Sequence, residues 1–207
     1  MKQGKVVGMI KRAKSLIVLE RDGEQWIGPG GCYWRMDGAP LLTKPEEFFS
    51  LYDVKRETGE SYYTDFDIFP AELDHRDFTP GEEEAQPLTA TVTWKGVEYR
   101  AFRWQSEILF CRAEYLTPAE RKDGEIVRYT VRRSERLGLY IAVKEGLFLA
   151  GIVFPSDMGA DNKLDFAGEL VDIAGAVRSA QKRAWATENG GEYAEEYADQ
   201  QTLEGAT

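Results

Sequence analysis

Short alternating segments separated by two-residue turns constrain the fold of this chain more than any other feature. Residues 89–94 and 97–104 alternate over much of their length on either side of Lys95-Gly96. This pattern predicts a β-hairpin, because Gly supplies the positive φ angle of a tight turn. Strands joined this closely pair antiparallel, since parallel neighbours need a crossover of a dozen or more residues. The other segments that favour strands are residues 15–20, 32–36, 108–116, 125–133, 138–144 and 147–154.

One long helix is predicted near the end of the chain, over residues 163–186. Leu164, Leu170 and Val177 belong to an apolar set that recurs near helical spacing, with acids in the first half and bases in the second. Threonine and glutamate residues at the spacing of an N-terminal capping box predict two short helices, over residues 44–54 and 118–123. We therefore expect an α+β fold in which an antiparallel sheet of six to eight strands is covered by the long C-terminal helix.

Composition favours one domain of ordinary size. The 207 residues are 43% hydrophobic, so we expect a single α+β domain over residues 1–187. Residues 1–14 lack the apolar core of a secretory signal, and no stretch approaches the roughly 18 apolar residues of a membrane span. Cys32 and Cys111 match no metal or redox spacing and are expected to be reduced thiols, with a disulfide as the alternative. These features favour the cytoplasm.

The net charge of −10 is distributed unevenly along the chain. Residues 46–84 hold 13 acidic and three basic residues, a net charge of −10. Residues 188–207 hold six acidic residues and no basic ones, which leaves the rest of the chain with a net charge of +6. Residues 55–87 show no sustained helical or strand periodicity, and we interpret them as an acidic insert. We expect its apolar residues to anchor it to the core and its acidic residues to face solvent. Residues 188–207 form an acidic tail.

The dense carboxylates of the insert suggest a function. Carboxylates at this density can imitate the phosphates of a nucleic acid and occupy the basic groove of a protein that binds nucleic acid. The alternative is that they only keep the chain soluble. The residues expected to contact a basic partner are Asp74, Asp77, Glu82, Glu83 and Glu84.

A basic stripe forms a second, weaker candidate site. Arg128 and Arg132 share strand parity and therefore one face of a strand, with Trp104 and Tyr129 nearby in sequence. Such a mixture can bind phosphates and stack bases, but the acidic composition argues against direct nucleic-acid binding. A solvated or internally paired face is the expected alternative. The residues of this anion-binding candidate are Arg128, Arg132, Arg133 and Arg136.

Catalytic chemistry has less support than binding. Residues 65–77 combine carboxylates with His75, the single histidine of the chain, a ligand set that suits Mg²⁺ or Mn²⁺. A segment this acidic brings carboxylates together without any function, however. The Gly28-Pro29-Gly30-Gly31 run lacks the Lys-Ser/Thr of a P-loop and is expected to be a bulged hairpin turn. A further hypothesis is an aromatic pocket of Trp26, Trp34 and Trp104.

We therefore expect a non-enzymatic interaction protein whose acidic surface binds a basic partner that itself binds nucleic acid, with inhibition by nucleic-acid mimicry as a mode of action. No cofactor, catalytic residue, metal site, direct nucleic-acid contact or membrane contact is expected. The alternatives are a metal-dependent hydrolase that uses residues 65–77 and a small-molecule binding module.

Overall fold

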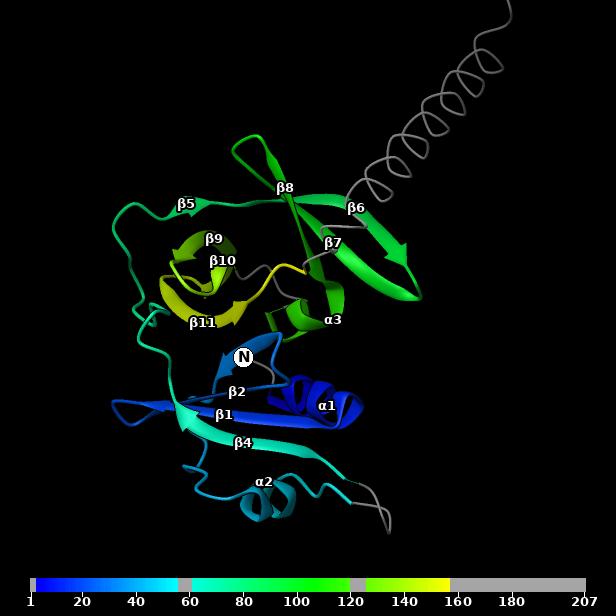
Figure 1. Cartoon of the computed structure of the whole chain (residues 1–207), viewed down its shortest axis with the longest axis vertical. Helices are drawn as coiled ribbons and strands as arrows, with labels where there is room; N and C mark the ends of the chain where they lie inside the picture. Colours follow the sequence, from blue (N-terminus) through cyan, green and yellow to red (C-terminus); the bar gives the residue numbers. More distant parts are fainter. Residues whose placement is uncertain (1–2, 56–60, 120–125, 157–207) are drawn as a thin grey trace, which may run out of the picture. The chain divides into compact units, whose positions relative to one another are not determined.

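Two β-sheets dominate the structure, a computed structural model that describes residues 3–55, 61–119 and 126–156 (Figure 1). Eight strands form one sheet in the order β4-β1-β2-β3-β11-β10-β9-β5, and three form the other in the order β6-β7-β8. The strands are β1 (Ser15–Arg21), β2 (Glu24–Gly28), β3 (Cys32–Arg35), β4 (Tyr63–Ile68), β5 (Glu83–Glu84), β6 (Gln86–Trp94), β7 (Val97–Trp104), β8 (Glu107–Arg112), β9 (Val127–Ser134), β10 (Gly138–Glu145) and β11 (Phe148–Val153). The helices among these residues are α1 (Gln3–Ala13), α2 (Pro45–Leu51), α3 (Ala113–Leu116) and the 3-10 turn η1 (Thr117–Ala119).

Tight turns join most strands that follow one another in the sequence. Asp22 and Gly23 have φ angles of 54° and 77° between β1 and β2, and Lys95 and Gly96 have φ angles of 49° and 76° between β6 and β7. Positive φ at both turn positions matches the right-handed twist of paired strands. The Asp-Gly and Lys-Gly pairs therefore form the turns that their residue types favour.

The Gly28-Pro29-Gly30-Gly31 run connects β2 to β3. A Cβ atom built at Gly28 would lie 1.7 Å from the carbonyl oxygen of Cys32, which leaves no room for a side chain. The first glycine is thus explained by the close approach of two backbone segments. The segment that follows is strand β3, whereas a phosphate loop would lead into a helix N-terminus.

Strand β4 corrects the expectation of purely antiparallel pairing. It lies parallel to β1, from Ser15 opposite Tyr63 to Glu20 opposite Ile68. The intervening chain contains β2, β3 and α2, which is long enough for a parallel crossover. Because β4 is an edge strand, none of its residues is fully buried, and its sequence lacks a clear apolar alternation. Part of residues 55–87 is therefore a strand.

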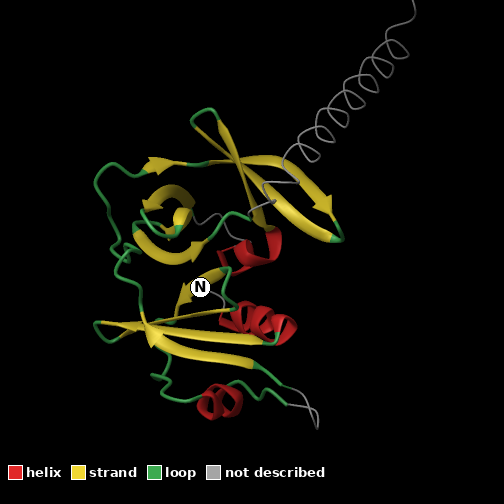
Figure 2. Ribbon diagram, in the orientation of Figure 1, coloured by secondary structure: helices red, strands yellow, loops and turns green. Residues whose placement is uncertain are grey.

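The predicted arrangement of a sheet under one long helix is wrong. The described helices contain only 11, 7 and 4 residues, and strands outweigh them (Figure 2). Two predicted elements, the helix over residues 163–186 and the tail at 188–207, lie outside the described residues. Helix α1 was missed, although Val6, Val7 and Ile10 have helical spacing and are buried.

The two short predicted helices differ in outcome. Helix α2 lies inside the range of 44–54. Of the helix predicted over residues 118–123, only the first two residues are described, and they belong to η1, which follows α3 directly. Thr117 lies at the C-terminal end of α3, where its hydroxyl donates to the carbonyl of Glu114 at 2.8 Å. The threonine thus contacts the last turn of the preceding helix. Residues 120–125 are not described.

Buried residues form two clusters on opposite faces of the eight-stranded sheet. Neighbouring residues such as Val18 and Leu19, or Trp26 and Ile27, belong to different clusters, as alternation along a strand requires. The larger cluster contains residues of α1, α2 and the three-stranded sheet. The smaller cluster contains strand residues together with Phe69 and Leu73. Residues 69–84, which we call the strap, therefore cover one face of the sheet on the way from β4 to β5 (Figure 1, cyan to green).

Candidate interaction site

Two apolar side chains anchor the start of the strap. Phe69 and Leu73 are each 1% exposed, and the Phe69 ring packs against Trp26 with centroids 5.3 Å apart. The backbone N–H of Phe69 also donates to the carbonyl of Glu20 at 2.9 Å. By contrast, the side chain of Phe78 is 70% exposed. Phe69 and Leu73 thus hold the start of the strap against the sheet, whereas Phe78 does not.

Arg132 of β9 fixes the middle of the strap. Its Nη1 donates to the carbonyls of Asp74 and Arg76 at 2.8 and 2.9 Å, and its Nη2 to the carbonyl of Asp77 at 3.4 Å. The Nε and Nη2 atoms also contact the Glu82 carboxylate at 2.9 and 2.8 Å. Four of these contacts are hydrogen bonds and the contact between Nη2 and Glu82 is an ion pair, so each nitrogen of the guanidinium has a partner within the molecule. Arg132 is therefore a structural clasp.

Glu82 is the carboxylate that this clasp neutralises. Its side chain is 9% exposed and forms ion pairs with both Arg132 and Lys144. Burial raises the pKa of Glu82, but hydrogen bonds from Lys144 and Arg132 outweigh that effect and lower its pKa below the ordinary 4.5. The carboxylate is consequently charged at neutral pH and faces inward, not toward a partner.

Asp74 is also used within the strap. Its carboxylate accepts hydrogen bonds from the Arg76 side chain and from the Thr79 hydroxyl, the latter at 2.9 Å. The bond from Arg76 lowers the pKa of Asp74 far below its ordinary value, against the opposing effect of burial. The backbone N–H of Asp74 donates to the Tyr140 hydroxyl at 2.9 Å. Asp74 therefore shapes the turn and connects it to β10.

Asp77 joins the strap to the neighbouring strands. Its Oδ1 accepts the backbone N–H of Leu149 at 2.8 Å and lies 3.6 Å from the guanidinium of Arg35. Three of the five acids expected to meet a partner thus have inward structural roles: Asp74, Asp77 and Glu82. Glu83 and Glu84 of β5 are exposed, as expected for residues that contact a partner.

A cavity of about 310 Å³ lies beside the strap. Glu72 and Glu83 are its exposed carboxylates, and the Gln105 amide donates to Glu83 at 2.8 Å. Trp104 is 8% exposed, and its indole N–H has no acceptor among the described residues. The residues around the cavity are Glu72, Asp74, Thr79, Pro80, Gly81, Glu82, Glu83, Trp104, Val131, Arg132, Arg133, Leu139 and Tyr140.

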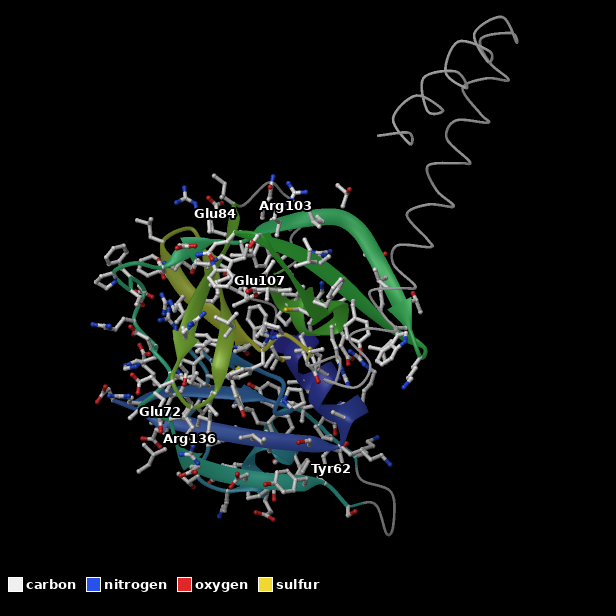
Figure 3. The ribbon with its side chains drawn as sticks, turned by 45° about the horizontal axis from the view of Figure 1, so that its top comes forward. Tyr62, Glu72, Glu84, Arg103, Glu107 and Arg136 are labelled. Carbon is white, nitrogen blue, oxygen red and sulfur yellow. The ribbon has the colours of Figure 1, made fainter. Side chains whose placement is uncertain are left out.

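The cavity brings together residues from both predicted sites. Asp74, Glu82 and Glu83 of the acidic set meet Arg132 and Arg133 of the basic set. The other members lie outside the cavity lining: Asp77, Glu84, Arg128 and Arg136. Figure 3 labels Glu72 and Arg136, whose charged groups are 3.5 Å apart at the surface.

The basic stripe does not form one face. Arg132 is buried, whereas Arg128, of the same strand parity, is exposed near the start of β9, and Arg133 is exposed on the opposite face. Sequence reasoning also missed Lys144 and Tyr140, whereas Trp104 was named as a candidate aromatic residue. Lys144 gave no clear signal, because it follows the apolar residues 139–143 and is itself followed by Glu145 at the end of β10. A buried lysine needs a charged partner, and Glu82 supplies it.

Catalytic arrangements find little support in the described residues. No group of three or more His, Cys, Asp or Glu side chains that could hold a metal ion occurs there, which includes residues 65–77. Cys32 and Cys111 are free and buried, and burial raises the pKa of Cys111 to about 12 and that of Cys32 further. Both thiols are therefore protonated at neutral pH and are poor nucleophiles.

The three tryptophans of the aromatic-pocket hypothesis do not line one pocket. Trp26 and Trp34 are fully buried and belong to clusters on opposite faces of the sheet. Trp104 belongs to the same cluster as Trp34, but of these three tryptophans only Trp104 lines the strap cavity.

Comparison with known protein families, with curated proteins and with solved structures finds no match to this chain. Within residues 3–55, 61–119 and 126–156, the helices are too short or too polar to cross a membrane.

Proposed function

We propose that this chain is a non-enzymatic interaction protein that binds a basic partner, a protein that itself binds nucleic acid, through the carboxylates around the strap cavity. The observation that carries the proposal is the pair of exposed carboxylates in the cavity lining, Glu72 and Glu83. The other two carboxylates of the lining, Asp74 and Glu82, are paired within the molecule, and so is the guanidinium of Arg132.

The cavity suits the side chain of a lysine or an arginine. A volume of about 310 Å³ is at the small end of the range for ligand pockets, roughly 300–1,000 Å³. Trp104 and Leu139 offer apolar surface for the aliphatic stem of such a side chain, while Glu72 and Glu83 attract its charged end. Opposite charges across an interface also steer a partner into place and raise its association rate.

Glu84 extends the acidic surface beyond the cavity, since it follows Glu83 directly in β5 and is exposed. A basic groove that normally contacts phosphates would meet these carboxylates, and inhibition by nucleic-acid mimicry follows if they occupy that groove. Two free thiols support a reducing compartment, and we place the protein in the cytoplasm as part of the proposal.

A labelled lysine-rich peptide provides the test. We expect the triple variant Glu72→Gln, Glu83→Gln, Glu84→Gln to bind it about tenfold more weakly than the wild type, or ~1.4 kcal/mol. All three side chains are exposed, so the fold is retained. Fluorescence anisotropy measures the affinity, and rising salt should erase the difference between the two proteins.

The matched control is Glu20→Gln, Asp53→Asn, Glu98→Gln, which changes the net charge equally at exposed positions outside the cavity. It should bind nearly as well as the wild type. If both triple variants lose the same affinity, binding depends on net charge alone and the proposed site is wrong.

A further inference from the structure

An open groove lies along α2, on a part of the chain that does not line the strap cavity. Its volume is about 510 Å³, within the range of ligand and peptide pockets. Two of its lining residues, Leu41 and Leu51, are 54% and 46% exposed. The residues around it are Pro40, Leu41, Leu42, Glu46, Glu47, Ser50 and Leu51.

The backbone beneath this groove is held firmly. Gln25 of β2 is buried and forms two hydrogen bonds with Leu42, both 2.7 Å long. The Leu42 N–H donates to the side-chain oxygen of Gln25, and the side-chain amide of Gln25 donates to the Leu42 carbonyl. Phe48 and Phe49 bury the other face of α2 in the core. A binding surface fixed in this way loses little conformational entropy when a partner docks.

The charged residues of the groove are all acidic. Glu46 and Glu47 lie in the first turn of α2, and no lysine, arginine or histidine is part of the lining. The Glu47 carboxylate accepts the backbone N–H of Thr43 at 2.7 Å, and this bond lowers the pKa of Glu47 below its ordinary value. The groove thus combines apolar lining residues with the carboxylates of Glu46 and Glu47.

We propose that this groove binds a protein segment in which large apolar side chains are flanked by lysine or arginine. The apolar side chains cover Leu41 and Leu51, and the flanking bases meet Glu46 and Glu47, which gives the site its charge complementarity. The groove is a second docking surface, beyond the strap cavity, and it does not require the strap cavity to function.

The probe is a short labelled peptide of leucine and lysine, compared with a peptide in which serine replaces every leucine. We expect the variant Leu41→Ser, Leu51→Ser to bind the leucine peptide at least tenfold more weakly than the wild type does. The serine peptide should bind the wild type as weakly as the leucine peptide binds this variant. Glu46→Gln should weaken binding severalfold, with a smaller loss at high salt.

The control Leu137→Ser, Leu147→Ser alters two exposed leucines elsewhere and should bind as the wild type does. The strap-cavity triple variant should also retain the leucine-dependent part of the affinity, which separates this proposal from the proposed function. Equal binding by the groove variant and its control would overturn the groove assignment. So would a wild-type dimer that Leu41→Ser, Leu51→Ser dissociates in light scattering, because the occupant would then be a second copy of this chain.

Discussion

Replacement of Arg132 by methionine is expected to lower the free energy of unfolding by about 3 kcal/mol. The substitution keeps an unbranched apolar stem but removes one of the two cations that pair with Glu82, which is only 9% exposed and keeps Lys144 as a partner. It also leaves the carbonyls of Asp74, Arg76 and Asp77 without their donor. A weakened buried ion pair and unsatisfied acceptors together account for a loss of this size.

Urea unfolding followed by tryptophan fluorescence measures this loss. The control is Arg133→Met in the next position of β9, where the side chain is exposed, and it should change stability by less than about 0.5 kcal/mol. A loss below about 1 kcal/mol for Arg132→Met would show that the strap does not depend on this clasp.

Acidification is expected to destabilise the protein through Asp74 and Glu82. Both carboxylates have a lower pKa in the folded protein than their ordinary values of 3.8 and 4.5, so the folded state binds fewer protons than the unfolded chain does. Their contribution is therefore complete above those ordinary values and is lost as the pH falls through and below them. Stability from these two groups should stay constant from neutral pH to about 5 and then decline.

The variant Asp74→Asn isolates one of these two groups. It should be less stable than the wild type at neutral pH. The difference should narrow as the pH falls below about 4, because Asp74 of the unfolded wild-type chain takes up a proton there while the folded carboxylate does not. Glu98→Gln, an exposed control on β7, should keep the wild-type pH profile. Chemical unfolding at a series of pH values gives the comparison. A constant difference between Asp74→Asn and wild type at all pH values would contradict the assigned role of the carboxylate.

Local patterns in the sequence predicted most strands, because the alternation of apolar and polar residues and the turn-forming residues can be recognised within a few neighbouring positions. Residues 97–104 were predicted as a strand and form β7 with the same bounds, and the turn at Lys95-Gly96 has the expected positive φ angles. Strand β4 escaped prediction because an edge strand buries little apolar surface. Its parallel partner β1 lies more than 40 residues earlier in the sequence, and no short-range rule specifies that pairing.

The acids of the strap show why composition alone misplaced part of the site. Counting charges predicted an outward display, yet whether Glu82 faces solvent depends on Arg132 and Lys144, about 50 and 62 residues later. No local signal marked this ion pair, since Lys144 lies beside Glu145 at the charged end of β10. The sequence therefore identified neither the buried lysine nor its partner.

The most direct test of the strap cavity as a binding site is a nuclear magnetic resonance titration of the ¹⁵N-labelled protein with the lysine-rich peptide. The indole N–H of Trp104, assigned with a Trp104→Phe variant, lies in the cavity wall, whereas the indole N–H of Trp34 donates to the Tyr115 carbonyl and does not line the cavity. We predict a saturable shift of the Trp104 signal, no shift of the Trp34 signal, and loss of the effect in the Glu72, Glu83, Glu84 triple variant. A peptide that binds without moving the Trp104 signal, or that moves it equally in the triple variant, would contradict the account.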